Sequence, residues 1–446
     1  MSLKKSYLIK KVKVFLNNLQ FEKYTEKNSI FYPACYINFI GSYTLSKILN
    51  VRSKKIKNIY IILKDILYSL KYLNPQIFRK KKLPFYNKIF FTWALDGDFE
   101  NDGSFKDRYL NINSKNLKNT LWFVIFLGKK KPEIVNENIV IIFFKKGFSI
   151  NLLFFLNFFL NRLKLLFYNN LYFLNSISNH NFFADIFLQE VKQFLKKDLR
   201  LVYMPFEGQP FQNKLIFYLK KNFRNIEILG YIHSPPLSFP TNFIFRKNTC
   251  PNKLIVNGDD QFYCFNKHLG WKKSSLKQIK SFRFLKDQKK NFINTIFLPL
   301  EIKSPEKVMN SFKTLIKKKK FSINNFLIRN HPVSNSPSNK KLINYIKFLK
   351  EDKKFNNKNK INYSIFIGNS GSIIEALERG SKVLHICEDE IFDVYSSLLY
   401  PNLTIKKISK NIYEYRIKKK GHLINFGTKN NNLSIILNLI KDKNIL

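Results

Sequence analysis

The stretch from Phe321 to Ile386 most constrains the fold, because strand-like and helix-like patterns alternate along it. One apolar run ends in a polar turn that holds Arg329 and His331, and a later one ends in the Gly/Ser turn at residues 368–372 and continues into a helical pattern. Strands that are joined through helices run parallel in one sheet. Their carboxyl ends meet at one edge, so we expect the two turns side by side where α/β proteins bind ligands.

The same alternation of apolar runs and helix-like segments occurs earlier in the chain. Runs that are apolar along their whole length are typical of strands in a parallel sheet covered by helices on both faces. The predicted strands lie in the segments KIFFTWAL, NTLWFVIFLG, ENIVIIFF, RLVYMP, IEILGYI, PNKLIV and NTIFLPL. We therefore predict an α/β fold in which two Rossmann-like domains face a cleft.

Breaks in this pattern indicate the domain organisation. The polar segment Phe282–Asn291 is predicted to be a linker, so that residues 1–290 form one domain and residues 291–446 form another. The Phe- and Leu-rich segment Asn151–Leu174 predicts a helical insertion near residues 150–198, either as core or as an interfacial helix.

The beginning of the chain carries weaker patterns. The alternation at Val12–Val14 favours a strand, and Tyr43–Leu73 has helix-like spacing with lysines on the outer face. The basic start lacks the sustained apolar core of a signal peptide. The longest apolar run, Ile150–Leu160, is too short to span a bilayer. We therefore expect a cytoplasmic protein, with peripheral attachment to the inner membrane as the alternative.

The His-Pro turn in the second half is a candidate phosphate-binding site. Pro332 cannot continue a strand ladder, which would leave the imidazole of His331 at the sheet edge. An imidazole there can hydrogen-bond a phosphate or a leaving group, and the guanidinium of Arg329 lies close in sequence. The alternative is a histidine that only ends a strand in a loop.

The Gly/Ser turn is a second candidate. Gly371 lets the backbone approach a ligand, and the following helix start favours an anion beside Ser370. Ser372 and Glu375 match a capping box, in which the serine caps its helix. The turn is not a P-loop, because no Gly-Lys-Ser/Thr sequence ends it.

A carboxylate follows a strand in the first half of the chain. Glu207 precedes Gly208 and Gln209 at the end of the RLVYMP strand. Glu207 can act as a base toward a hydroxyl if partial burial raises its pKa, and the alternative is an acid that satisfies backbone donors at a helix start. His233, one strand and helix later, can line the same cleft.

Metal and cofactor sites are not predicted. Asp96-Gly97-Asp98 has the form of a carboxylate pair that binds a metal–nucleotide complex, but the surrounding loop does not have the spacing of a calcium site. The four cysteines form no CxxC pair, which argues for a reducing compartment and against structural zinc.

The chain carries a formal net charge of +48. Such a charge favours an anionic partner: a nucleic acid, a lipid surface or a phosphorylated substrate. The abundance of Lys, Asn, Ile and Phe, with only 14 Gly, is also typical of a strongly AT-biased genome, which would account for most of the lysines without any partner.

Three turns in this order, an acid-Gly, a His-Pro and a Ser-containing turn, resemble those of bacterial sialyltransferases and related CMP-sugar transferases of the GT-B type. The segments FEGQPFQNKLI, ILGYIHS and PNKLIVNGDDQ are also similar to bacterial surface carbohydrate biosynthesis proteins. The resemblance implies that Glu207 deprotonates the acceptor, and that His331, Ser370 and Ser372 hold the CMP phosphate. The chain departs from the family in having one acid in the first motif.

The hypothesis is a glycosyltransferase of the GT-B type, inverting and metal-independent, that acts in surface polysaccharide synthesis. The resemblance implies a nucleotide-sugar donor, a CMP-linked nonulosonate or Kdo, and a glycan or lipid-linked glycan acceptor. The basic surface would rest on an anionic membrane. Three alternatives stay open: a nucleotide-sugar epimerase of the same fold, a basic nucleic-acid-binding protein, and a scaffold with a decayed site. No nucleic acid is expected under the main hypothesis.

Overall fold

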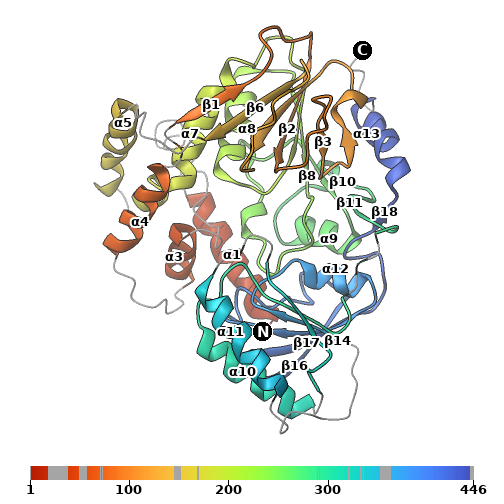
Figure 1. The fold of residues 1–446 in the computed structure, drawn as a ribbon. Helices are drawn as coiled ribbons and strands as arrows, with labels where there is room; N and C mark the ends of the chain where they lie inside the picture. The colour runs from red at the N-terminus through yellow and green to blue at the C-terminus, as the bar shows by residue number, and fades with distance from the viewer. Residues whose placement is uncertain are drawn as a thin grey trace.

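The architecture comes from a computed structural model of the chain (Figure 1). Two α/β units lie one above the other in this view, and the amino-terminal helix lies against the lower one. The residues that the structure describes are 2–18, 39–49, 58–70, 72, 74–144, 152–167, 170–288, 290, 292–319, 322–331, 334, 336–351 and 363–441. Cys35 and Pro332, both named in the sequence analysis, lie outside them.

An eight-stranded sheet forms the first unit, and it contains all six strands predicted for this half. Its strands in spatial order are β1 (Pro75–Phe78), β6 (Ile139–Phe144), β5 (Thr120–Phe126), β2 (Lys88–Ala94), β7 (Leu201–Pro205), β8 (Glu227–Tyr231), β9 (Lys253–Val256) and β10 (Leu276–Gln278). All neighbours pair in parallel except β1 with β6.

The strands of the first sheet are apolar throughout because both faces are covered. All seven residues of β5 are buried. One face packs in the same cluster as α7 (Asn179–Lys192) and α8 (Pro210–Asn222), and the other packs with Ile436 of the last helix, α13 (Asn432–Lys441). Apolar side chains at every strand position therefore find apolar neighbours.

The second unit is built on a six-stranded sheet. Its strands in spatial order are β13 (Leu327–Arg329), β12 (Thr295–Phe297), β14 (Tyr363–Ile367), β15 (Lys382–Ile386), β17 (Ile412–Ile417) and β16 (Leu403–Ser409). The first four are parallel, and β17 and β16 are antiparallel. The helices α10 (Pro305–Lys319), α11 (Pro337–Glu351) and α12 (Ser372–Glu378) connect the parallel strands.

The predicted fold class, two Rossmann-like α/β units, is therefore confirmed. Each end of the chain crosses to the other unit: the Lys5 amine in α1 (Ser2–Asn18) donates to the carbonyl of Val394, and the Asn432 amide in α13 donates to the carbonyls of Leu110 (2.9 Å) and Phe282 (3.0 Å). The domain boundary at residue 290 stays a prediction. The contacts of α1 and α13 tie the two units together.

Two predictions about local structure were wrong. Val12 lies in helix α1 and not in a strand, because Leu8, Val12 and Leu16 recur at helical spacing and are buried together. The segment predicted to be a polar linker begins with β11 (Ser281–Leu285), which pairs with β18 (Phe426–Gly427). The apolar side chains of β11 are buried. The lysines of the segment gave it the composition of an exposed linker, although part of it forms a strand.

The remaining elements complete the two units. Helices form where helical spacing was predicted, in α3 (Phe39–Ile48) and α4 (Asn58–Leu70) and, in the insertion, in α5 (Leu152–Leu163) and α6 (Asn170–Ser176). The others are α9 (Asp259–Lys267), β3 (Lys106–Asp107), β4 (Ile112–Asn113) and the 3-10 turns at residues 114–116, 164–167, 241–243, 273–275 and 429–431. In the described part of the chain, no helix has the length and apolar character needed to cross a membrane.

The segment that follows β8 is held against the second unit by hydrogen bonds. The hydroxyl of Tyr395 donates to the carbonyl of Pro236 (3.0 Å), and that of Tyr400 donates to the carbonyl of Leu237 (2.5 Å). The hydroxyl of Ser238 donates to the carbonyl of Phe392 (2.5 Å). The carboxyl end of β8 is therefore positioned by the other unit.

His385 holds the turn after β14 from inside the second unit. It is fully buried in β15, with Nε2 2.8 Å from the carbonyl oxygen of Gly368 and Nδ1 3.0 Å from the hydroxyl of Tyr415. With the proton on Nε2, one nitrogen donates to Gly368 and the other accepts from Tyr415. Burial lowers the pKa of His385 to about 4, although the bond to Gly368 favours the protonated form.

Because the pKa of His385 is depressed, acid should destabilise the fold through this residue. From its ordinary value of 6.5 down to about 4, the unfolded chain binds a proton that the folded chain excludes. The free energy of unfolding should then fall by up to about 1.4 kcal/mol for each pH unit. His385→Gln should remove this slope, measured by urea denaturation across that range. Parallel curves for the variant and the wild type, above and below pH 6.5, would contradict the assignment.

Candidate functional site

The turn between β7 and α8 presents Glu207. The turn is tight at Gly208, where φ is +66° and a Cβ atom would lie 2.2 Å from the carbonyl oxygen of Asn242. The Asn242 side chain donates to the carbonyl of Glu207 (2.6 Å), and Pro210 begins the helix. Only glycine combines this φ with so close a backbone approach.

Glu207 and His233 meet at the carboxyl edge of the first sheet. Nε2 of His233 lies 3.1 Å from Oε1 of Glu207, and the Gln209 amide donates to the other carboxylate oxygen. The His233 side chain is 5% exposed and that of Glu207 is 34% exposed, so the imidazole is covered while the carboxylate reaches solvent. The sequence-predicted grouping of Glu207, Gln209 and His233 is thus a direct set of contacts.

The electrostatics of the pair bear on the condition that a base at Glu207 needs a pKa raised by burial. Burial does favour the protonated acid, but hydrogen bonds from His233 and Gln209 and the charge of Arg283 outweigh it, so the pKa of Glu207 is lowered. Burial lowers the pKa of His233, against the opposing influence of Glu207. The condition of a raised carboxylate pKa is therefore not met: the pair is an ionised carboxylate beside a neutral imidazole.

Aromatic rings enclose His233. The Tyr109 ring lies 4.4 Å from the imidazole, centroid to centroid, and the Trp93 ring lies 6.2 Å away. The guanidinium of Arg283 lies 5.7 Å from the Tyr109 ring. Nδ1 of His233 is buried and makes no hydrogen bond among the described residues. No local sequence pattern indicated this enclosure, because its parts come from β2, from the turn after β3 and from β11.

A buried carboxylate positions Tyr109. Asp107 accepts hydrogen bonds from the backbone N–H groups of Tyr109 (2.9 Å) and Leu110 (2.5 Å) and from the hydroxyl of Thr92. Burial raises the pKa of Asp107 to about 6 in spite of these donors. In the sequence, the one sign of a structural role for Asp107 is that it belongs to the acidic segment that begins at Asp96.

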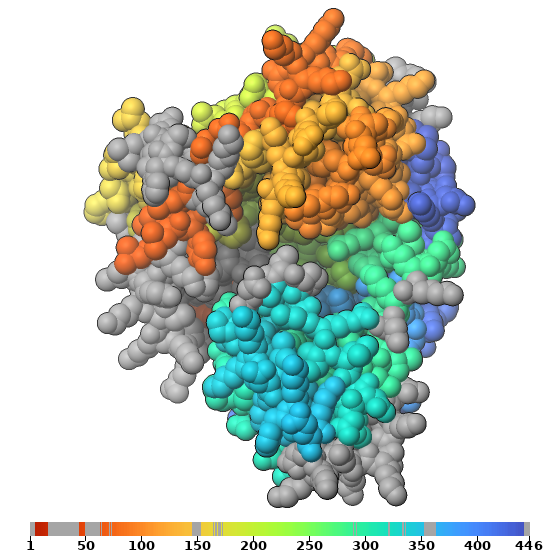
Figure 2. All heavy atoms as spheres, viewed as in Figure 1, coloured from red at the N-terminus to blue at the C-terminus, as the bar shows by residue number. Residues whose placement is uncertain are grey.

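The Gly/Ser turn after β14 faces the segment that leads from His233. A Cβ atom on Gly371 would lie 3.3 Å from Pro235, and the hydroxyl of Ser238 lies 3.5 Å from Oδ1 of Asn369. The turn and the Glu207–His233 edge therefore belong to one junction between the units. Figure 2 shows a recess between the upper and lower units on this face.

The predicted capping box in this turn was wrong. Ser372 is the first residue of α12, the cap position is Gly371, and no side chain caps the helix. The hydroxyl of Ser370 instead accepts from the N–H of Ser372 (3.3 Å). Ser372 cannot cap the helix because it is already inside it. The hydrogen bond to the Ser370 hydroxyl satisfies the N–H of Ser372 instead.

Glu375 has a different place from the one expected of a ligand-binding residue. Its side chain is 6% exposed and lies 2.9 Å from the amine of Lys290 and 3.2 Å from Nε of Arg379. Arg379 also donates to the carbonyl of Gln288 (2.6 Å). The carboxylate thus anchors the connection between the units.

Arg329 and His331 lie at the edge of the second sheet. β13 is the edge strand, and both side chains are exposed. β12 separates β13 from β14, so the turn with Ser370 begins about 10 Å away by strand spacing. Asn339 links the ends of β13 and β12, because its amide donates to Oδ1 of Asn330 after β13 (2.9 Å) and to the carbonyl of Pro299 after β12 (2.7 Å).

The acidic loop uses its carboxylates internally. Asp96 accepts from the N–H groups of Lys129 (3.1 Å) and Lys130 (3.0 Å), and Asp98 pairs with Arg108 (2.5 Å). Among the described residues, no group of three or more His, Cys, Asp or Glu side chains could hold a metal ion. The three described cysteines are buried and form no disulfide.

Comparisons with known proteins leave the family open. No family model matches the chain. One curated protein, the DNA-directed RNA polymerase subunit beta of Eimeria tenella, is 26% identical over 335 residues, which cover 68% of this chain. The aligned region spans 30% of that protein, and its identity is too low to assign a family.

Two solved structures are similar only in part. A glycosyltransferase from Rickettsia africae ESF-5 has a TM-score of 0.32 and 13% identity, over 67% of this chain and 78% of that one. The catalytic domain of starch synthase IV from Arabidopsis thaliana, bound to ADP and acarbose, has a TM-score of 0.31 and 11% identity, over 81% and 93%. Likeness at this level carries no functional argument.

The Gly208 turn should be intolerant of a side chain. Gly208→Ala combines an unfavourable positive φ with a clash against Asn242, so it should cost about 1–3 kcal/mol or more in unfolding free energy. Gly421→Ala is the matched control, since φ is +84° there and no atom lies within 4 Å of a Cβ. Urea denaturation should show the larger loss for Gly208→Ala. Equal losses would mean that the Asn242 contact does not constrain the turn.

His233 should control the ionisation of Glu207. His233→Phe removes the hydrogen bond that offsets burial, so the pKa of Glu207 should rise. Titration of the labelled carboxyl carbon by NMR measures the shift. The control is His268→Phe, which changes a histidine that contacts the hydroxyl of Ser6 in α1 and should leave the titration of Glu207 unchanged. A Glu207 pKa that stays the same in His233→Phe would show that the pair is not coupled.

Proposed function

We propose that the protein is a glycosyltransferase of the GT-B type that uses a nucleotide-sugar donor. The observation that supports the proposal is the contact of the Gly371 turn with Pro235, which lies two residues after His233, the partner of the candidate base Glu207. Ligands of α/β units bind at the carboxyl ends of parallel strands, and here two such ends share one junction.

The proposed reaction is an inverting transfer without a metal ion. The acceptor hydroxyl would give its proton to Glu207 as its oxygen forms a bond to the anomeric carbon. The bond from that carbon to the donor phosphate would break, and the nucleotide would leave with both electrons. Because the pKa of Glu207 is lowered, proton transfer would be concerted with bond formation. His233 would keep the carboxylate oriented toward the acceptor.

The second unit would hold the donor. Ser370, Gly371 and Ser372 would offer hydroxyl and backbone N–H groups to the phosphate, and Arg329 and His331 would compensate its charge from the sheet edge. The sequence resemblance favours a CMP-linked nonulosonate or Kdo. The proposed acceptor is a glycan, lipid-linked, in surface polysaccharide synthesis, which would place the protein on the cytoplasmic face of a membrane.

Nucleotide binding is the first test. CMP, UDP, GDP and their sugars are added to the full chain, and thermal unfolding is followed. A ligand at a hundredfold excess over its Kd should stabilise the folded state by about 2.7 kcal/mol. His331→Ala and Ser370→Ala should reduce the shift, whereas Ser434→Ala, which alters an exposed serine on α13, should not. Absence of a shift with every nucleotide would reject the proposal.

Glu207→Gln separates binding from chemistry. The variant keeps a side chain that can bond His233 but cannot accept a proton, so donor binding should persist while transfer falls by about 10²–10⁴. The control is Glu351→Gln on the exposed end of α11. Transfer is followed as release of free nucleotide in the presence of acceptor glycans. Full activity of Glu207→Gln would exclude Glu207 as the base.

The alternatives give different outcomes in the same assays. An epimerase of this fold would convert the nucleotide sugar without any acceptor. A nucleic-acid-binding protein, which the charge of +48 favours, would bind DNA or RNA with a steep salt dependence and show no nucleotide-sugar shift. A scaffold protein with a decayed site would neither convert nor bind a nucleotide sugar and would not bind nucleic acid.

A further inference from the structure

Helix α5 and the turn after it expose a row of large apolar side chains. The exposed residues recur every three or four positions and lie along one side of the helix. They are Leu153 (74% exposed), Leu156 (48%), Leu160 (58%), Leu163 (44%) and Phe167 (91%). Among the residues of α5 whose side chains the structure describes, the exposed polar ones beside the row are Asn157 and Asn161, which are uncharged. Isolated exposed leucines are common, but a contiguous row marks an interaction site.

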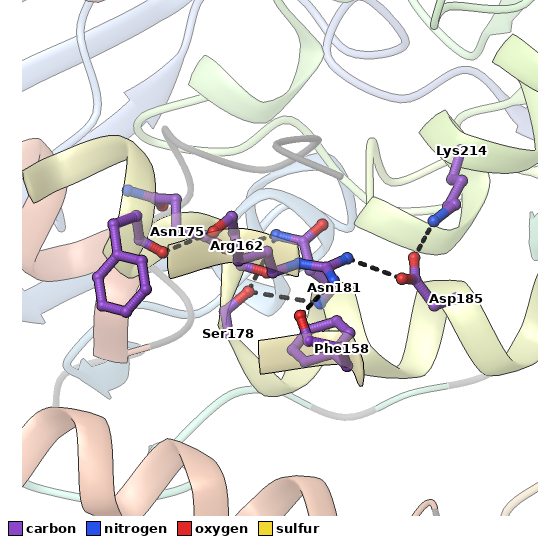
Figure 3. A network of polar contacts seen from close by, with 9 residues as sticks. Phe158, Arg162, Asn175, Ser178, Asn181, Asp185 and Lys214 are labelled. Carbon is purple, nitrogen blue, oxygen red and sulfur yellow. Dashed lines mark hydrogen bonds and ion pairs between the residues drawn. The ribbon is translucent and has the colours of Figure 1, made fainter. Parts of the chain in front are cut away.

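The orientation of α5 is fixed by its one arginine, which points inward. The guanidinium of Arg162 is 3% exposed and donates to the carbonyls of Phe158 (2.6 Å) and Ser176 (3.0 Å) and to Asp185 (2.7 Å), as Figure 3 shows. Asp185 also pairs with Lys214. Turning the leucines inward would leave a buried ion pair broken, which is strongly destabilising. The leucines are therefore held outward.

Helix α4, on the same side of the molecule (Figure 1), also exposes large apolar side chains. It exposes Leu63 (55%), Leu67 (66%) and Tyr68 (42%). Its last residue, Leu70, packs in the cluster of Phe158 and Phe182 that also buries the inner side of α5. The two helices lie on the same side of the molecule in Figures 1 and 2. We call their exposed apolar residues, together with Phe167, the α4–α5 face.

A basic cavity opens next to this face. It has a volume of about 580 Å³ and lies between α7 and α8, with Phe154 of α5 in its wall. Its other lining residues are Asp185, Leu188, Gln189, Lys192, Lys214, Phe217, Tyr218, Lys221 and Asn222. Three lysines and one carboxylate line the cavity, and Lys214 pairs with that carboxylate, so Lys192 and Lys221 supply the excess of positive charge beside apolar and aromatic walls.

We propose that the α4–α5 face is a docking surface for an anionic phospholipid bilayer. The leucine row would enter the boundary between head groups and acyl chains, and Lys192 and Lys221 would bind lipid phosphates at its border. Charge decides between occupants: a second copy of a chain with a net charge of +48 would be repelled, and an anionic membrane would attract it. Docking on a membrane does not depend on the proposed transfer reaction. The further idea that docking delivers a lipid-linked acceptor to the junction does rest on the proposed function.

The test is sedimentation of the full chain with vesicles of phosphatidylcholine, with and without phosphatidylglycerol. Wild-type protein should bind the anionic vesicles more tightly. Leu156→Glu/Leu160→Glu should lower partitioning by about tenfold or more, because apolar burial is lost and charge is added. Phe348→Glu is the control: this residue on α11 is 60% exposed and should leave binding unchanged. Circular dichroism confirms that each variant is folded.

A second pair of variants tests the basic border. Lys192→Gln/Lys221→Gln should reduce the preference for anionic over neutral vesicles and leave the apolar contribution in place. Equal binding of wild type and Leu156→Glu/Leu160→Glu, or no preference for anionic lipid, would overturn the proposal. So would a wild-type dimer in sedimentation equilibrium that the leucine variant abolishes. Nucleotide binding, measured on the same preparations, tests the transferase proposal separately.

Discussion

The hydrogen bonds between the segment after β8 and the second unit are the constraint on which the candidate site depends. The carbonyls of Pro236 and Leu237 and the hydroxyl of Ser238 bond to residues of the other unit, and His233 lies just before them. A segment held in this way can move only if those bonds break. The chain on both sides of His233 is also held within the first unit, by Asn257 at Ile232 and Gln261 at Ser234, so contacts from both units position the partner of Glu207.

Buried polar groups supply the remaining order of the molecule. Asp107 orients the backbone at Tyr109, His385 holds Gly368, and Arg162 anchors α5. Each of these groups would cost several kcal/mol if buried without partners, and each has partners from separate parts of the chain. Such groups select one arrangement of loops and helices. The apolar core of Val, Ile, Leu and Phe would tolerate several.

The proposed membrane face and the proposed transfer site are connected through the first unit. α8 begins directly after the Gly208 turn and ends at the basic cavity that borders α5. A protein that docks through this face would hold its junction at a constant distance from the lipid surface. That geometry suits an acceptor that is carried on a lipid and a donor that arrives from solution.

The sequence by itself determined the strands that are apolar along their length, their parallel pairing and the polar turns that end them, because apolar runs and turn residues are local signals. It also identified Glu207 and His233 correctly as neighbours of one edge. The tertiary structure alone decided the lowered pKa of Glu207, the strand hidden in the supposed linker, and the inward direction of Arg162. Each of these results depends on partners that are distant in sequence, and no local pattern records which partner a buried charge will meet.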